Sequence, residues 1–335
     1  MAGMCQRRRV GLWGFALAVA LAAAACGDSP TEPSPPPPAQ LTLTCPAAQT
    51  AVSATGQPVT VTWQGPTAQG GTPPITTTCT PASGSPFAVG TTTVGCVATS
   101  AAASQLATCA FSVTVTRPPQ LSVSKFMAFG DSITWGQDSV PAGLLTYPVP
   151  APSYSYPSQL LSILTAAYPG QTFTVANEGW PGERVAVGLS RLPSALATNA
   201  PEVVLLLEGA NDLLASPSSA TTQYIADSLR DMVRVCRTRV AVSRVLLATF
   251  PPQFVGVPPN RGAGAAFVPE LNQRIAAVAQ SEGATLVDLY AVFPAGGKPY
   301  IGVDGLHPTE QGFVLMAQTF AKTIKEKFEV TPAAR

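Results

Sequence analysis

Two stretches of this sequence hold residue types suited to nucleophilic chemistry. Residues 126–137 read F-M-A-F-G-D-S-I-T-W-G-Q, an apolar run that ends in Gly130-Asp131-Ser132. The run predicts a buried strand, and the glycine predicts a turn after it. Ser132 would then lie at the carboxyl end of a strand, where open α/β sheets bind their ligands.

A serine hydroxyl needs a base, and the chain has a single histidine, His307, within the sequence D-G-L-H-P. Asp304, three residues earlier on the same tight turn, can orient the imidazole that takes the proton from the serine. Each residue also has a simpler interpretation, because a serine after a strand can cap a helix and an aspartate can stabilise a turn. The presence of all three favours nucleophilic catalysis.

Two further blocks lie between these stretches. Asn177 to Gly182 reads N-E-G-W-P-G, and Gly209 to Asp212 reads G-A-N-D. With G-D-S before them and D-G-L-H after them, they make residues 125–328 resemble the GDSL, or SGNH, hydrolase family. A second Gly-Asp-Ser, at positions 27–29, shows how little the tripeptide means alone.

The resemblance implies a carboxylester hydrolase with a Ser132-His307-Asp304 triad and an acyl-enzyme intermediate. Acetylated glycans, lysophospholipids and other acyl esters are all candidate substrates, because a fold does not fix the substrate. Two alternatives remain open, an acyltransferase and a catalytically inert surface-binding lipoprotein. No metal and no other cofactor is expected, because the sequence has no His-rich or carboxylate-rich cluster of metal ligands.

The resemblance also implies three donors that stabilise an oxyanion. They are the backbone N–H groups of Ser132 and Gly182 and the side-chain amide of Asn211, and each such donor contributes about 3–4 kcal/mol to transition-state stabilisation. Gly179 is an alternative to Gly182. Asn177 is expected to fix the loop that carries Gly182.

The elements that must position these residues alternate between strands and helices over residues 118–330, which predicts a parallel sheet with helices on both faces. The family resemblance implies a flavodoxin-like three-layer α/β/α domain with five strands. The predicted strands are Lys125–Phe129, Gln171–Ala176, Glu202–Leu207, Arg244–Thr249 and Thr285–Asp288, and the predicted helices are Tyr156–Ala167, Arg184–Ala197, Gln223–Cys236, Pro269–Glu282 and Pro308–Lys327.

Two loops depart from the minimal family plan, residues 138–155 and residues 254–267. Both should overhang the carboxyl ends of the strands and form an acyl or alcohol pocket, or else serve only for packing. Asp131 is a further pocket candidate, although its main expected role is to bind the backbone of its own turn. The candidates for the apolar walls of the pocket are Tyr147, Tyr154, Tyr156 and Phe254.

The first 26 residues resemble a bacterial lipoprotein signal. A basic segment, Arg7 to Arg9, precedes an apolar run and then Ala23-Ala24-Ala25-Cys26. Cleavage there would leave Cys26 as a lipidated N-terminus on the cell envelope, at the outer membrane or cell surface. The alternative is an ordinary export signal cut nearby. The Pro-rich residues 27–40 predict an extended tether, and residues 331–335 a short tail.

Residues 41–117 are rich in Thr, Val, Ser and Gly and alternate as short strands do. This pattern predicts a small antiparallel sandwich, and the text around its cysteines resembles a hyalin-repeat (HYR) module with an immunoglobulin-like fold. Four cysteines allow three pairings; we favour Cys45–Cys109 with Cys79–Cys96, because the first bridge would tie the terminal strands together. The module is expected to be a spacer, or else to bind glycan or protein.

Overall charge limits the partners. The 335 residues carry a net charge of +1, and only 11% of them are charged. No basic face for nucleic acid is expected. The partners that the two resemblances imply are an ester substrate and, through the lipid anchor, a membrane.

Overall fold

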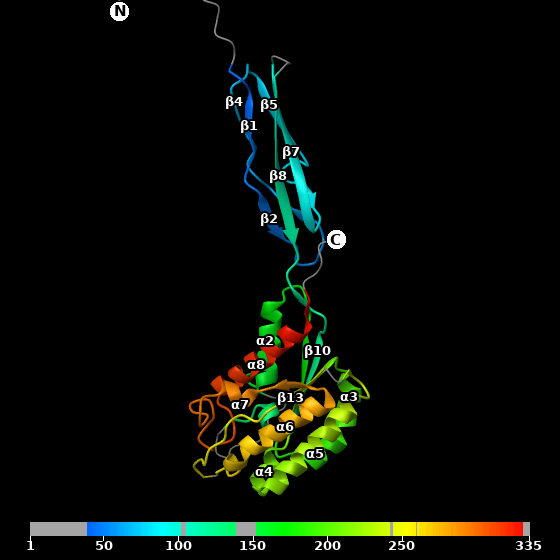
Figure 1. Ribbon diagram of the computed structural model, residues 1–335, viewed down its shortest axis with the longest axis vertical. Coiled ribbons are helices and arrows are strands. Elements are labelled where there is room, and N and C mark those ends of the chain that lie inside the picture. Colours follow the sequence, from blue (N-terminus) through cyan, green and yellow to red (C-terminus); the bar gives the residue numbers. More distant parts are fainter. Residues whose placement is uncertain (1–38, 102–104, 139–151, 242–243, 259, 331–335) are drawn as a thin grey trace, which may run out of the picture.

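The structure, a computed structural model, describes residues 39–101, 105–138, 152–241, 244–258 and 260–330. They form a slender β module and a larger α/β unit, joined end to end (Figure 1). The predicted signal with Cys26, most of the linker, Tyr147 and the predicted tail lie outside the described residues. Among the described helices, none combines the length and the apolar character needed to cross a membrane.

The β module is built on a four-stranded sheet in the order β2-β8-β7-β5, with the short pairs β1-β4 and β3-β6 beside it. Buried and exposed residues alternate along β7 and β8, as one covered face requires. Trp63 lies edge-on to Phe87 and Phe111 within the module core. The all-β prediction is confirmed, but the sheet is not wholly antiparallel as predicted, because β2 pairs with β8 in parallel. The strands are β1 (Thr42–Thr44), β2 (Gln49–Val52), β3 (Val59–Thr60), β4 (Thr67–Gln69), β5 (Ile75–Thr80), β6 (Pro86–Phe87), β7 (Gly90–Ser100) and β8 (Leu106–Thr116).

Two disulfides cross this module, Cys45–Cys109 and Cys79–Cys96, which is the favoured pairing. Cys96 of β7 lies opposite Cys79 of β5 on one side and opposite Cys109 of β8 on the other. The bridges are therefore neighbours on the sheet. Each should stabilise so small a core by about 2–4 kcal/mol, chiefly by restricting the unfolded chain.

The α/β unit holds a five-stranded parallel sheet in the order β11-β10-β12-β13-β14. This is the predicted flavodoxin-like order, in which the second strand lies at one edge and the first lies next to it. The central strand β12 is apolar and buried throughout, as a strand covered on both faces must be. The strands are β10 (Lys125–Gly130), β11 (Thr174–Gly179), β12 (Val203–Leu207), β13 (Val245–Ala248) and β14 (Thr285–Val287).

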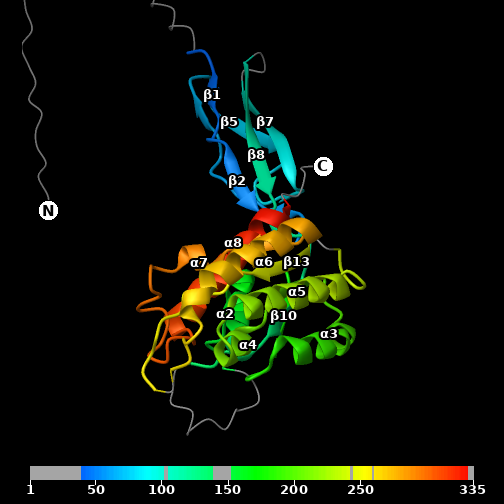
Figure 2. The ribbon, with the colours of Figure 1, turned by 60° about the horizontal axis from the view of Figure 1, so that its bottom comes forward.

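Helices cover both faces of the sheet. On one face α2 packs against α8, and on the other α5 packs against α3 and α6 (Figures 1 and 2). The long helices are α2 (Tyr156–Ala167), α3 (Val185–Asn199), α5 (Ser219–Cys236), α6 (Val268–Glu282) and α8 (Glu310–Phe328). Three short helices follow the strands β10, β12 and β14, and they are α1 (Ser132–Trp135), α4 (Ala210–Ala215) and α7 (Leu289–Val292). A 3-10 turn (Ala265–Phe267) precedes α6. The short strand β9 (Gln120–Leu121) pairs with β15 (Glu329–Val330).

The predicted boundaries differ from the structure where side chains compete with the ladder or cap a helix. β11 begins at Thr174, not at Gln171, because the Gln171 side chain bonds both backbone groups of Leu121 at 2.7 and 2.9 Å. α5 begins at Ser219, earlier than predicted, because Ser218 caps it. α8 begins at Glu310, after the cap Thr309.

Candidate active site

Ser132 follows the carboxyl end of β10 and is the first residue of α1. Its Oγ is 2.9 Å from Nε2 of His307, although 175 residues separate them in sequence. Both side chains are almost completely buried. The predicted nucleophile and the predicted base are therefore in hydrogen-bond contact.

The loop after Ile301 carries both Asp304 and His307. The Nδ1 of His307 is 2.6 Å from Oδ2 of Asp304, and Oδ1 of Asp304 accepts the backbone N–H groups of Leu306 and His307, both at 3.0 Å. Burial by itself would raise the pKa of Asp304, but the hydrogen bond and the charge of His307 outweigh it, and the pKa lies below its usual value. An ionised Asp304 therefore fixes the ring with Nε2 toward the serine.

The second inserted loop holds the backbone of this acid–base loop. Phe254 N–H donates to Gly305 C=O at 3.0 Å, and Arg261 N–H donates to Asp304 C=O at 2.9 Å. A Cβ placed on Gly305 would lie 1.9 Å from the Phe254 carbonyl oxygen, so the two loops touch backbone to backbone. The sequence predicted that loop 254–267 forms a pocket. In the structure this loop also holds the backbone of Asp304 and Gly305 by hydrogen bonds.

The predicted oxyanion donors lie on two neighbouring loops. Gly182 has a φ of +81°, which favours glycine, and no atom lies within 4 Å of a Cβ placed there. Asn211 Nδ2 donates to the Glu183 carbonyl at 2.8 Å, which leaves its second N–H for a ligand. The Gly179 N–H already donates to Asn177 Oδ1 at 3.0 Å, which makes Gly182 the better donor candidate.

Asp131 does not line a pocket, contrary to the prediction that made it a candidate. It is fully buried, and its carboxylate accepts the N–H groups of Ile133 at 3.0 Å and Ala210 at 3.1 Å. Burial raises the pKa of Asp131 to about 6, against the lowering effect of these bonds. The expected role of binding the turn backbone describes it better.

The aromatic pocket candidates separate into three groups. Tyr156 is fully buried and stacked on Phe320 in the core, so the prediction that it lines a pocket is wrong. Tyr154 is half-buried and lines a groove beside α8, and Phe254 lines a cavity of about 510 Å³ next to the Asp304 loop. Tyr147 lies outside the described residues.

Sequence reasoning missed Trp180 as a site residue. Its side chain is 57% exposed, and with Gly182 and Val187 it lines a cavity of about 380 Å³ on the oxyanion loop. Arg191 lies 5.2 Å from its ring and pairs with Glu183 at 2.6 Å, which holds the loop. The signal that could have indicated Trp180 is its place between Gly179 and Pro181 in the N-E-G-W-P-G block, because a large side chain on a turn can remain exposed.

One cluster of described residues has the spacing of metal ligands, and it consists of Cys45, Cys96 and Cys109. All three sulfurs belong to the disulfides. These three cysteines therefore serve as cross-links in the structure and not as metal ligands.

A strand-end serine in contact with a histidine–aspartate pair, on a flavodoxin-like sheet, is an arrangement typical of serine hydrolases. Residues 128–315 match the model of the GDSL-like lipase/acylhydrolase family, and residues 35–115 match the HYR domain. The first match spans more than half of the chain, and the protein belongs to the GDSL-like lipase/acylhydrolase family, a family of ester hydrolases.

Solved structures agree with this assignment. The lipase/acylhydrolase from Enterococcus faecalis is 26% identical, with a TM-score of 0.50, over 63% of this chain and 100% of its own. The native M. smegmatis aryl esterase is 25% identical, with a TM-score of 0.50, over 61% and 100%. Est24, a carbohydrate acetylesterase from Sinorhizobium meliloti, shares the fold at 20% identity and a TM-score of 0.50, over 61% and 100%. No curated protein matches the chain.

Proposed function

We propose that the protein is an exported, lipid-anchored carboxylester hydrolase that works through an acyl-enzyme on Ser132. The observation that carries the proposal is the chain of contacts from Ser132 Oγ to His307 Nε2, 2.9 Å, and from His307 Nδ1 to Asp304 Oδ2, 2.6 Å. This arrangement performs general-base activation of a hydroxyl.

In the first half-reaction Ser132 Oγ attacks the ester carbonyl carbon while His307 Nε2 takes the hydroxyl proton. Asp304 stabilises the imidazolium that forms. The negative oxygen of the tetrahedral intermediate is held by the backbone N–H groups of Ser132 and Gly182 and by the free N–H of Asn211. As the intermediate collapses, the alcohol leaves with the proton from His307, and the acyl group stays on Ser132.

In the second half-reaction water takes the place of the alcohol. His307 removes its proton, the resulting tetrahedral intermediate uses the same three donors, and the acid leaves as Ser132 regains its proton. The deep burial of Ser132 and His307 favours a small acyl group over a long chain. The exposed Trp180 gives the alcohol or acyl part an aromatic face beside Gly182.

Hydrolysis of p-nitrophenyl esters from acetate to palmitate tests the proposal. The chain without residues 1–26 should be fastest on the shortest esters. Ser132→Ala should lose turnover by about ten-thousand-fold or more while its thermal unfolding stays close to that of the parent. Turnover in Ser132→Ala equal to the parent would refute the nucleophile, and silence on every ester would refute the esterase.

Export and anchoring rest on Arg7 to Arg9, the apolar run and Cys26, and the two disulfides suit an oxidising compartment. In a bacterial host the full chain should sediment with membranes and be released by detergent. Cys26→Ser should move it to the soluble exported fraction. Membrane retention of that variant would contradict lipidation at Cys26.

A further inference from the structure

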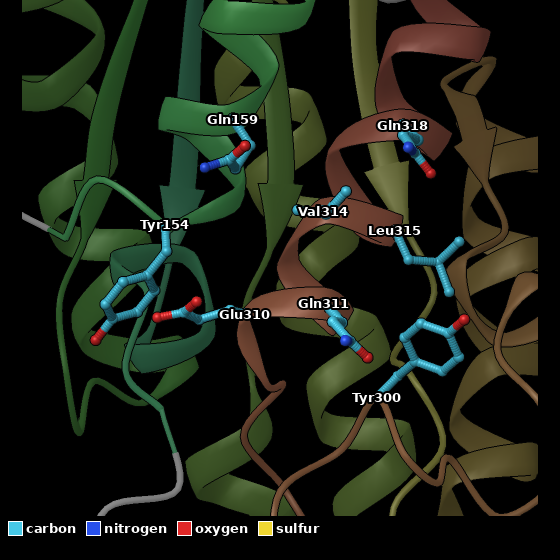
Figure 3. A pocket seen from close by; sticks show the side chains of 8 residues that line it. All are labelled: Tyr154, Gln159, Tyr300, Glu310, Gln311, Val314, Leu315 and Gln318. Atoms are coloured by element: carbon cyan, nitrogen blue, oxygen red, sulfur yellow. The ribbon is translucent and has the colours of Figure 1, made fainter.

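A groove runs along the first turns of α8, outside the triad. It has a volume of about 530 Å³ and is bordered by α8, the start of α2 and the segment before Ile301 (Figure 3). Two tyrosines, Tyr154 and Tyr300, lie at its sides. Its polar lining comes from Gln159, Gln311, Gln318 and Glu310.

The chemistry of this lining selects a neutral ligand rich in hydroxyl groups. None of the described residues that line the groove is basic, so they offer no cationic partner for a phosphate or a carboxylate, and the Glu310 carboxylate repels both. Glutamine amides both donate and accept hydrogen bonds, as hydroxyl groups also do. A tyrosine ring offers an apolar face with a polar tip, which suits the C–H face of a sugar ring.

The two tyrosines are already held in position. The Tyr154 ring lies 6.2 Å from the ring of Phe313, and the Tyr300 ring lies edge-on to Phe293 at 6.0 Å. The Tyr300 carbonyl also accepts the N–H of Thr309 at 2.8 Å. Rings that are ordered before binding lose little entropy when a ligand arrives.

The groove begins where the chain leaves the triad. Glu310, at one end, follows His307 by three residues. The Gln137 N–H donates to the Ser132 carbonyl at 2.9 Å, and the next residue, Asp138, accepts the Tyr154 hydroxyl at 3.5 Å. In Figure 3 Tyr154 and Glu310 lie together at one end and Gln318 at the other. Eight residues of helix separate Glu310 from Gln318, a span of about 12 Å, enough for a short oligosaccharide.

We propose that this groove binds the backbone of a neutral polysaccharide that carries the ester cleaved at Ser132. The inference rests on the proposed esterase function and adds the substrate class to it. The leaving alcohol is then a sugar hydroxyl, and the rest of the glycan lies along α8.

Binding to the Ser132→Ala chain tests the groove without turnover. The probes are hexasaccharides of the xylo-, cello-, manno- and chito- series, an oligogalacturonate and a neutral peptide, followed by calorimetry. At least one neutral hexasaccharide should bind, and Tyr300→Ala or Gln311→Ala should weaken it about tenfold. Gln280→Ala, an exposed glutamine on α6, is the matched control and should leave the affinity unchanged.

Three outcomes overturn the groove assignment: no binding by any neutral hexasaccharide, tighter binding of the acidic sugar or the peptide, or equal affinity in the groove variants. Gln311 is exposed, so its variant reports on the groove even if Tyr300→Ala does not fold. Tyr300→Phe keeps the ring and should retain most of the affinity.

Kinetics separate this inference from the esterase function. In the active chain the ratio of kcat/KM on an acetylated oligosaccharide to that on p-nitrophenyl acetate should fall about tenfold in Gln311→Ala, through a higher KM for the glycan. Serine-dependent hydrolysis of p-nitrophenyl acetate with an unchanged ratio refutes only the groove. Loss of all serine-dependent hydrolysis refutes the esterase, while the Ser132→Ala binding assay still decides the groove.

Discussion

The Asp131 carboxylate accepts a hydrogen bond of 3.1 Å from the backbone N–H of Ala210, across the ends of β10 and β12. Asp131 precedes the nucleophile candidate, and Ala210 precedes Asn211. One buried side chain therefore ties the turn that carries Ser132 to the turn that carries Asn211, the proposed nucleophile and a proposed oxyanion donor.

Asp131→Asn should lower kcat by about 10- to 100-fold with little change in KM, because an amide nitrogen would face one of the two N–H groups that the carboxylate now binds. Steady-state kinetics on p-nitrophenyl acetate measure this. An unchanged kcat in a folded variant would show that the tie does not position the site.

The same variant has a pH signature. Burial raises the pKa of Asp131 to about 6, so the folded chain holds its proton more tightly than the unfolded chain. The contribution of Asp131 to the free energy of unfolding therefore falls as pH rises from about 4 to 6, by up to about 1.4 kcal/mol per pH unit. Above about pH 6 this contribution no longer changes with pH. The difference in unfolding free energy between parent and Asp131→Asn should follow this course from pH 4 to 8, and a constant difference would contradict it.

Asn211→Ala should lower kcat by about 100- to 1,000-fold and leave KM nearly unchanged, because the lost N–H acts on the oxyanion and not on the ground state. It also loses the bond to Glu183 C=O, so unfolding should occur slightly earlier. Asn199→Ala is the matched control. Its side-chain amide donates a 2.7 Å hydrogen bond to Glu178 Oε1, and neither residue belongs to the triad. It should lose stability but keep kcat; equal losses of kcat in both variants would remove the oxyanion role.

Glu208 is fully buried, and neither carboxyl oxygen has a hydrogen-bond partner among the described residues. Burial, and then the charges of Asp131 and Glu183, raise its pKa well above the usual value. Because the pKa of Glu208 is higher in the folded chain than in the unfolded chain, Glu208 lowers the free energy of unfolding of the parent progressively as pH rises above about 4.3. Glu208→Gln cannot ionise, so its Tm relative to the parent should rise by several degrees between pH 5 and pH 8.

Thermal unfolding across that pH range measures the Glu208 effect. Glu183→Gln gives the contrast, because it removes one of the two carboxylates that pair with Arg191 and should destabilise the chain. A Tm difference between Glu208→Gln and the parent that is constant with pH would show that Glu208 does not carry a raised pKa.

Deleting residues 41–117 should leave kcat and KM on p-nitrophenyl acetate within about twofold of the parent, because the α/β unit has its own core and contains every residue assigned to the reaction. The truncated chain should be compared with the parent in the same buffer. A collapse of kcat in a folded truncation would assign the module a part in catalysis.

Local signals predicted much of this fold. α2 begins and ends where its apolar periodicity and its proline place it, and the apolar run at residues 203–207 became a buried central strand. The four motif blocks placed Ser132, Asp304 and His307 together because each follows a strand end or a tight turn. These features depend on neighbours in sequence.

The features that were missed depend on contacts distant in sequence. The backbone of Phe254 meets Gly305, and Glu208 becomes buried only when α3 and α5 close over it. Tyr156 was expected at a pocket because it borders the inserted loop 138–155, but its ring stacks on Phe320 in the core. No periodicity or motif encodes such pairings, because they form only when the sheet and its helices assemble.

The Cys45–Cys109 bridge has a mechanical consequence. It joins the residue that follows β1 to the last strand of the module, β8, 64 positions away, and the chain enters the module before Cys45 and leaves it after Cys109. A pulling force applied between residue 39 and the α/β unit is therefore carried through one covalent bond. The chain between the two cysteines cannot be extended by that force, and the module can lengthen only if residues 110–116 of β8 detach from β2 and β7 or the segment before Cys45 detaches from β4.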